Sequence, residues 1–253
     1  MPKLNYKEIN KYISENVMKP FYEIRLDKLS ALNLNTILKR KNPYLFKAKN
    51  IETSGEFVKY ILDAYLSSQE ETMFGNLLEH LAIFVCQKTF KGRKAVQGVL
   101  KSVDLEFEKG GKYYIVGIKS GIYWGNKDQI DRMKSNFKIA RKILQKSGIK
   151  KEIIAVNGCI YGKDNKPFKK DKDSSQSYYK ICGQEFWELI SGDNKLYKNI
   201  ILPLDKEAKK RSDHFKEIYF EKSNEMIKQF SNNFLTKKGL IDWEKMIDFV
   251  SKK

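Results

Sequence analysis

Cysteine and histidine are both scarce in this chain of 253 residues. The cysteines, Cys86, Cys159 and Cys182, are odd in number and widely spaced, and the histidines are His80 and His214. This set matches no zinc-ligand spacing, and no Ser–His or Cys–His arrangement points to a covalent intermediate. The cysteines lie in apolar sequence, so we expect small core residues in a reduced compartment. His80 is expected at an edge or in the core, and not as a ligand.

The sequence also lacks a hydrophobic run of membrane-spanning length, and its start, MPKLNYKEINKYI, has no signal core. We therefore expect a soluble, cytoplasmic protein. Acidic residues are in deficit as well: 49 Lys and Arg stand against 31 Asp and Glu, which gives a formal net charge of +18. Such an excess favours a polyanionic partner, most commonly nucleic acid. A membrane surface and a simple lysine bias of the composition are the alternatives.

The most informative stretch is residues 103–119, VDLEFEKGGKYYIVGIK, whose pattern predicts a β-hairpin. Gly110 and Gly111 suit a two-residue turn because both tolerate positive φ. This turn would set Asp104 opposite Gly117, and Gly117 would leave room beside the charged groups. Alternation along the strands gives an apolar face and a charged face. The first carries Val103, Leu105, Phe107, Tyr114, Val116 and Ile118, and the second carries Asp104, Glu106, Ile115, Gly117 and Lys119. A half-solvated hairpin without catalytic function would alternate in the same way.

Helices and further strands are expected on both sides of this hairpin. The periodicity predicts helices over residues 5–41, 54–90, about 127–146, 183 to about 192, and two over 206–253. It predicts strands over 95–100, 152–161 and 178–182, a connector over 42–50, and a polar loop over 163–177. The helix at 127–146 would carry a basic ridge of Lys127, Lys134, Lys138 and Arg141. Glu79 lies in an apolar part of the helix at 54–90, where a carboxylate must pair, bind a cation or lie at the rim.

The order helix, three strands, helix, strand, with aspartate and lysine on one hairpin, resembles the PD-(D/E)xK nuclease core. More specifically, VDLEF, IVGIKSGIYWGN, AVNGCIYG and KICGQEFWELISGD resemble one group of bacterial type II restriction endonucleases, over about residues 70–205. The resemblance implies an α/β fold with a mixed β-sheet core (αβββαβ) flanked by helices. It implies a single nuclease domain over 1–253, with a helical segment at 1–50, the catalytic core at 54–205 and a second helical segment at 206–253.

By this resemblance Asp104 is the metal-binding aspartate and Lys119 the catalytic lysine. The sequence departs from the family pattern at Gly117, where an acidic residue is expected, so the second carboxylate must come from elsewhere. Glu79 matches a position where related nucleases place a glutamate. Glu106 lies on the same hairpin face as Asp104, about 6–7 Å along the strand. Both remain candidates, and Glu79 is favoured.

The implied reaction is sequence-specific cleavage of double-stranded DNA. Mg²⁺ held by Asp104, a glutamate and the Ile118 carbonyl would activate water and neutralise charge at the phosphate, with assistance from Lys119. The products would carry a 5′-phosphate and a 3′-hydroxyl. The rival readings are a repair or nicking nuclease with the same core, or a catalytically inactive basic DNA-binding protein in which Gly117 marks a decayed site.

Residues that follow the catalytic strand are expected to reach the DNA. Ser120, Tyr123 and Trp124 are candidates for phosphate or groove contacts. Asn126, Gln129 and Lys134 are further candidates for DNA contacts. Base readout usually uses Arg, Lys, Asn or Gln at a groove edge, and the sequence does not single out which of these residues perform it. Asn126 and Gln129 also have the spacing of a capping box at a helix start. Cutting both strands of a palindrome favours a twofold homodimer, and a cognate DNA methyltransferase is expected in the same system without physical contact.

Overall fold

The computed structural model describes residues 4–96 and 98–253, and these form two compact units. The first unit combines the described residues up to Met18 with Gly75–Lys206, and the second combines Lys19–Phe74 with Glu207–Lys253. Two long helices, α5 (Ser54–Phe90) and α9 (Ile201–Phe234), contribute residues to both units. Despite their length, no helix in the described part of the chain is apolar enough to cross a membrane.

The first unit contains a mixed sheet whose strands lie in the order β1-β2-β3-β4-β6-β5. Strands β3, β4 and β6 are parallel to one another, and the other pairings are antiparallel. The strands are β1 (Arg93–Lys94), β2 (Leu105–Lys109), β3 (Lys112–Lys119), β4 (Ile153–Cys159), β5 (Phe168–Lys169) and β6 (Tyr178–Cys182). The α/β fold and the αβββαβ order predicted from the sequence are confirmed.

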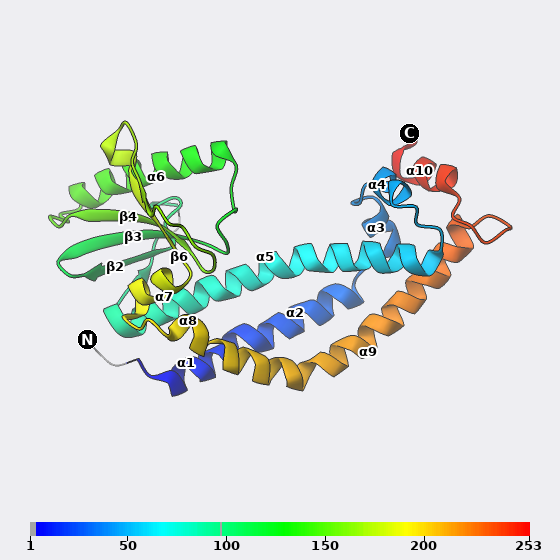
Figure 1. The fold of residues 1–253 in the computed structure, drawn as a ribbon, viewed down its shortest axis with the longest axis horizontal. Helices are drawn as coiled ribbons and strands as arrows, with labels where there is room; N and C mark the ends of the chain where they lie inside the picture. The colour runs from blue at the N-terminus through cyan, green and yellow to red at the C-terminus, as the bar shows by residue number, and fades with distance from the viewer. Residues whose placement is uncertain (1–3, 97) are drawn as a thin grey trace. The chain divides into compact units, whose positions relative to one another are not determined.

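Helices cover both faces of this sheet, as Figure 1 shows. On one face lies α6 (Lys127–Lys146), whose residues Met133, Phe137, Ala140 and Leu144 are buried in a cluster with Ile115, Ile153 and Ala155 of the sheet. The other face is covered by the end of α5, where the ring of Phe90 stacks on that of Phe107 at 5.7 Å between centroids, and by α7 (Gln184–Ser191). Burial on both faces accounts for the continuous apolar runs in the parallel strands.

The hairpin forms around Gly110 and Gly111, which have φ values of 57° and 76°, and its register is confirmed from Lys109↔Lys112 to Leu105↔Val116. The predicted pairing of Asp104 with Gly117 is wrong. The ladder ends at Leu105, and the Asp104 N–H donates to the Val116 carbonyl at 2.8 Å. Two successive residues thus share one partner, as in a β-bulge.

The bulge corrects a second expectation, because it moves Val103 to the other face of the sheet. Val103 packs into the cluster beneath α6, with Ile115 and Phe137, and not beside Leu105. A one-residue shift in a strand reverses the direction of every side chain beyond it. Strict alternation could therefore not place the residues that precede Asp104.

Three further predictions of local structure need correction. Of the predicted strand at 95–100, residue 97 lies outside the described residues, and residues 95, 96 and 98–100 form no strand; the edge strand is Arg93–Lys94. The predicted connector at 42–50 contains a helix, α4 (Pro43–Ala48), which Asn42 caps and in which Pro43 takes the first position, a favourable place for proline. The polar loop at 163–177 contains β5 and a 3₁₀ turn (Ser174–Gln176). By contrast, α6, α7 and β6 begin and end close to the predicted residues.

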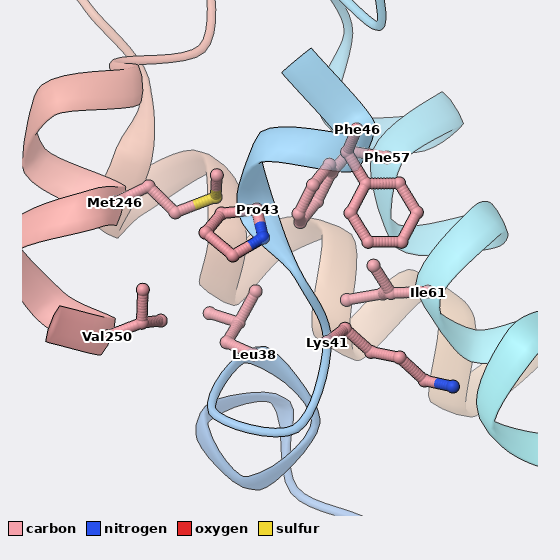
Figure 2. Close-up of a pocket in the computed structure, with 8 residues that line it drawn as sticks. All are labelled: Leu38, Lys41, Pro43, Phe46, Phe57, Ile61, Met246 and Val250. Atoms are coloured by element: carbon pink, nitrogen blue, oxygen red, sulfur yellow. The ribbon is translucent and has the colours of Figure 1, made fainter. Parts of the chain in front are cut away.

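The second unit is helical, and aromatic side chains form much of its core. Phe57 stacks on Phe230 at 4.7 Å between ring centroids and meets the edge of Trp243. Figure 2 shows a small pocket in this unit, lined by Leu38, Lys41, Pro43, Phe46, Phe57, Ile61, Met246 and Val250. The remaining helices of the chain are α1 (Tyr6–Tyr12), a π-helical turn (Ile13–Met18), α2 (Lys19–Ser30), α3 (Leu34–Leu38), α8 (Leu196–Asn199) and α10 (Trp243–Ser251).

Gly158 in β4 allows α7 to pack closely on the sheet, which makes it a test of this layer. A Cβ at this position would collide with the Phe186 ring and lie 3.1 Å from Val116 Cγ1. We predict that Gly158→Ala lowers the free energy of unfolding by about 1–3 kcal/mol because the core is overpacked. Urea denaturation followed by circular dichroism measures this change. Gly55→Ala, with no neighbour nearer than 4.0 Å, is the control, and equal stability of the two variants would contradict the packing argument.

Candidate active site

Asp104 is held at the end of the hairpin by two hydrogen bonds to β3. Its carboxylate oxygen Oδ2 accepts the main-chain N–H of Ile118 at 2.7 Å, and its own N–H donates to Val116. The side chain is half-buried and lies against the strand residue that precedes Lys119. The hairpin therefore brings Asp104 and Lys119 together, as the sequence predicted.

Glu79 reaches the same place from α5. Its carboxylate is half-buried and, among the described residues, forms no hydrogen bond or ion pair. Burial raises the pKa of Glu79 above its ordinary value, and the negative charge of Asp104 raises it further, whereas Lys94 and Lys119 oppose the shift. Glu79 thus interacts electrostatically with the Asp104 carboxylate and with the ammonium groups of Lys94 and Lys119. A carboxylate with a raised pKa and no partner is in a position where a cation would be favourable.

Both carboxylate oxygens of Glu106, the alternative to Glu79, take part in a separate hydrogen-bond network. Glu106 is 2% exposed; its Oε1 accepts from Arg93 Nε at 2.7 Å, and its Oε2 accepts from the Tyr113 hydroxyl at 2.7 Å. Arg93 also donates to Tyr113. The network joins β1, β2 and β3, and it satisfies a charge that would be costly to bury unpaired. The geometry thus favours Glu79 over Glu106 as the second free carboxylate.

Lys94 was missed by the sequence reasoning, although it belongs to the basic stretch KGRK before the hairpin. It pairs in β1 with Leu105, the neighbour of Asp104, and the next residue, Ala95, donates its N–H to the Asp104 carbonyl at 3.1 Å. The positive charge of Lys94 lowers the pKa of Glu79 and so acts against the upward shift caused by burial. The pKa of His80 is lowered mainly by burial and further by the charge of Lys94. Because the strand is only two residues long, periodicity could not have identified it.

The expectation that Gly117 leaves room beside the charged groups is wrong. A Cβ at Gly117 would lie 2.5 Å from the main-chain oxygen of Ser102. Ser102 has a positive φ of 58° and brings the chain back against β3 just before the bulge. The position that carries an acidic residue in the family pattern is therefore closed by main chain, and a longer side chain has no space there.

The loop after Lys119 contains three of the predicted DNA-contacting residues in different environments. Tyr123 is 95% exposed. Trp124 is half-buried, donates its indole N–H to Asn157 Oδ1 at 3.0 Å, and has the Lys119 ammonium 5.4 Å from its ring centroid. Ser120 is half-buried beside Gly75 of α5, and its carbonyl accepts the N–H of Tyr161. Of the three, Tyr123 is the side chain that is freely available to another molecule.

The other predicted DNA contacts have intramolecular partners. Asn126 and Gln129 form the full capping box of α6, with both hydrogen bonds at 3.0 Å. Lys134 pairs with Asp131 and, at 2.6 Å, with Asp171. Further along the helix, the same loop engages the rest of the basic ridge through Lys138 to Asp173 and Arg141 to the carbonyls of Ser175 and Ser177.

Among the described residues, no group of three or more His, Cys, Asp or Glu side chains is arranged so that it could hold a metal ion. Asp104 and Glu79 supply carboxylate oxygens, the ligand type that a hard divalent cation prefers. The cysteines are free and buried, as expected. Burial raises the pKa of the Cys86 thiol to about 12, so it is an unreactive group.

The sequence profile of the family described as "Type II restriction endonuclease EcoO109I" matches residues 7–212. Among individual curated proteins, no significant match is found. The family match includes Glu79, Lys94, Asp104 and Lys119, together with all strands of the sheet.

The contact between Gly117 and Ser102 can be tested by substitution. We predict that Gly117→Ala destabilises the fold by about 1–3 kcal/mol. Gly117→Glu, which restores the acidic residue of the family pattern, should bind Mn²⁺ no more tightly than the unchanged protein in calorimetry. Gly75→Ala is the control, since its nearest neighbour is at 3.5 Å and alanine is favourable within a helix. A stable Gly117→Glu protein with tighter metal binding would show that the space exists.

Proposed function

Because the chain belongs to the type II restriction endonuclease EcoO109I family, and is thus a site-specific deoxyribonuclease acting on double-stranded DNA, we propose that Asp104, Glu79 and Lys119 carry out its reaction. The observation that carries this proposal is the convergence of α5, the β2 bulge and β3 on one place. There, Glu79 has no hydrogen-bonding partner among the described residues and is coupled to both Asp104 and Lys119.

Enzymes of this family generally use a divalent metal ion, and we propose Mg²⁺. Asp104 would offer its free carboxylate oxygen, since Oδ2 accepts from Ile118, and Glu79 would offer the second carboxylate. The Ile118 carbonyl is proposed as a main-chain ligand. The ion, when bound, would supply Lewis-acid activation of water and neutralise charge at the phosphate. Binding of a cation would also relieve the repulsion between the two carboxylates.

Lys119 would act on the same phosphate through its ammonium group. In the described part of the chain it forms no hydrogen bond or ion pair, so its three donors remain available. It can donate to a non-bridging phosphate oxygen or hold the attacking water. Charge that develops on the phosphate in the transition state would be stabilised by a donor that is already in place. Lys94 would add a second positive charge at the edge of the site.

The proposal also covers the organisation of the chain, its oligomeric state, its partners and its contacts with DNA. We propose that the chain functions as one nuclease, with 54–205 as the catalytic core and 1–50 and 206–253 as helical additions, and that it acts as a homodimer in the cytoplasm. A methyltransferase of the same system would protect host DNA. Tyr123 would contact the DNA from the loop that leaves β3, with Ser120 beside it.

The first experiment tests cleavage and the assignment of the carboxylates together. Purified protein is incubated with unmethylated phage DNA and Mg²⁺, and we expect discrete fragments that disappear without metal. Asp104→Ala and Glu79→Gln should each lower the cleavage rate on the order of 100-fold, because each removes a metal ligand. Glu106→Gln should retain cleavage in the folded protein.

Glu108→Gln is the matched control, since Glu108 lies exposed on the same strand and pairs with Lys151 at the surface. Circular dichroism verifies that each variant is folded. Full activity of Glu79→Gln together with loss of activity in Glu106→Gln would reverse the assignment of the second carboxylate. Nicked or structure-dependent products in place of discrete fragments would favour a nicking or repair nuclease with the same core.

The exposed side chain of Tyr123 predicts a contact with DNA. Tyr123→Ala should weaken binding of the cognate duplex about tenfold, a loss of about 1.4 kcal/mol, because an aromatic surface beside the site is removed. Fluorescence anisotropy in the presence of Ca²⁺ measures the Kd without cleavage. Tyr44→Ala serves as control, since Tyr44 is also exposed but lies in α4. Equal affinity of the two variants would remove Tyr123 from the interface.

A further inference from the structure

Trp124 contacts both Asn157 and Lys119, which lie on neighbouring strands of the sheet. The Lys119 ammonium lies 5.4 Å from the centroid of the Trp124 ring. Within this distance a lysine is attracted to the face of an indole ring. We propose that Trp124, held by Asn157, is a positioning residue for the Lys119 ammonium. This inference rests on the proposed function of Lys119.

Asn157 fixes the orientation of the Trp124 ring. It is 1% exposed, lies in the middle of β4, and pairs with Gly117 of β3. Its Oδ1 accepts from Trp124 Nε1 at 3.0 Å, and its Nδ2 donates to the Gly117 carbonyl at 3.4 Å. An indole nitrogen can only donate, and a carbonyl oxygen can only accept, so the two ends of the amide cannot exchange. The ring is thereby tied to the main chain of β3 close to Lys119.

The fixed position of the Trp124 ring is important because the Lys119 side chain is otherwise weakly restrained. Within the described residues, Lys119 has no hydrogen bond and no ion pair, so the Trp124 ring is the contact that limits where its ammonium can lie. Lysine is a point charge on a flexible stem with many rotamers. Catalysis by a positioned donor requires that the donor be in place before the transition state forms. A ring fixed by a buried amide provides that restraint.

The same contacts argue that Trp124 is not a DNA ligand. Its one polar group is already bonded to Asn157, and the side chain is half-buried. Tyr123, the preceding residue, is 95% exposed. Tyr123 therefore faces solvent, whereas the neighbouring Trp124 lies against Lys119.

The test is a double-mutant cycle between Trp124 and Lys119 in the full-length protein. Single-turnover cleavage is measured at saturating enzyme for Trp124→Leu, Lys119→Ala and the double variant. We expect Trp124→Leu to lower the rate about tenfold, as loss of a partly desolvated cation–π contact would, with the Kd for DNA unchanged. In the Lys119→Ala background, Trp124→Leu should have no further effect. Trp124→Phe, which retains a ring, should recover part of the rate.

A second measurement does not depend on residual activity. In protein labelled with ¹³C-lysine, the Lys119 side-chain resonance, identified by its absence in Lys119→Ala, should be shifted upfield by the indole ring. The shift should be lost in Trp124→Leu and in Asn157→Leu. Tyr44→Leu, an exposed aromatic outside the site, is the control and should leave the resonance unchanged.

Three outcomes would overturn the inference. Weaker DNA binding by Trp124→Leu with an unchanged saturating rate would make Trp124 a DNA contact. Equal losses from Trp124→Leu with and without Lys119 would make its effect independent of the lysine. A Lys119 resonance unaffected by Trp124→Leu would show that the ring does not contact the ammonium. Wild-type cleavage by Lys119→Ala is a separate result, since it would remove the proposed role of Lys119 itself.

Discussion

The hydrogen bond from the Ile118 main-chain N–H to the Asp104 carboxylate is the interaction on which the site depends. Together with the bond from the Asp104 N–H to Val116, it closes the hairpin with a bulge. A regular ladder would continue to pair main chain with main chain at this point. The bulge instead assigns one of these amides to a side chain, so the carboxylate is fixed relative to the strand that ends in Lys119. Charge on the carboxylate strengthens the bond.

The same bulge is consistent with the proposal that the second carboxylate comes from a helix. Once the chain turns back before Asp104, the Ser102 carbonyl occupies the space next to Gly117. An acidic side chain on that position of β3 has no room, whereas α5 passes over the sheet and can supply Glu79. Loss of the acid at Gly117 is thus linked to the local path of the backbone. In this reading glycine accommodates close packing of main chain, and it is not a sign of a decayed site.

How much of this was predictable depends on the range of the interactions. The Gly110–Gly111 turn and the capping box of α6 are local, and the sequence was sufficient to predict both. Asp104 and Lys119 followed from the hairpin and the family resemblance. The bulge was not predictable, because it depends on how residues 98–103 lead back to the sheet. The ion pair between Lys134 and Asp171 was also not predictable, because the loop at 163–177 has no periodicity that would indicate which helix it contacts.

The pairing of the α6 ridge changes how the charge of +18 should be understood. Ion pairs such as Lys134–Asp171 and Lys138–Asp173 remove individual lysines from contact with phosphate, yet they leave the net charge of the chain unaltered. Long-range attraction of DNA depends on that net charge and is screened by salt, whereas close contacts depend on side chains that remain free. The excess charge is therefore suited to bring DNA to the protein, and in the proposed mechanism placement of the phosphate would fall to the few groups around Lys119.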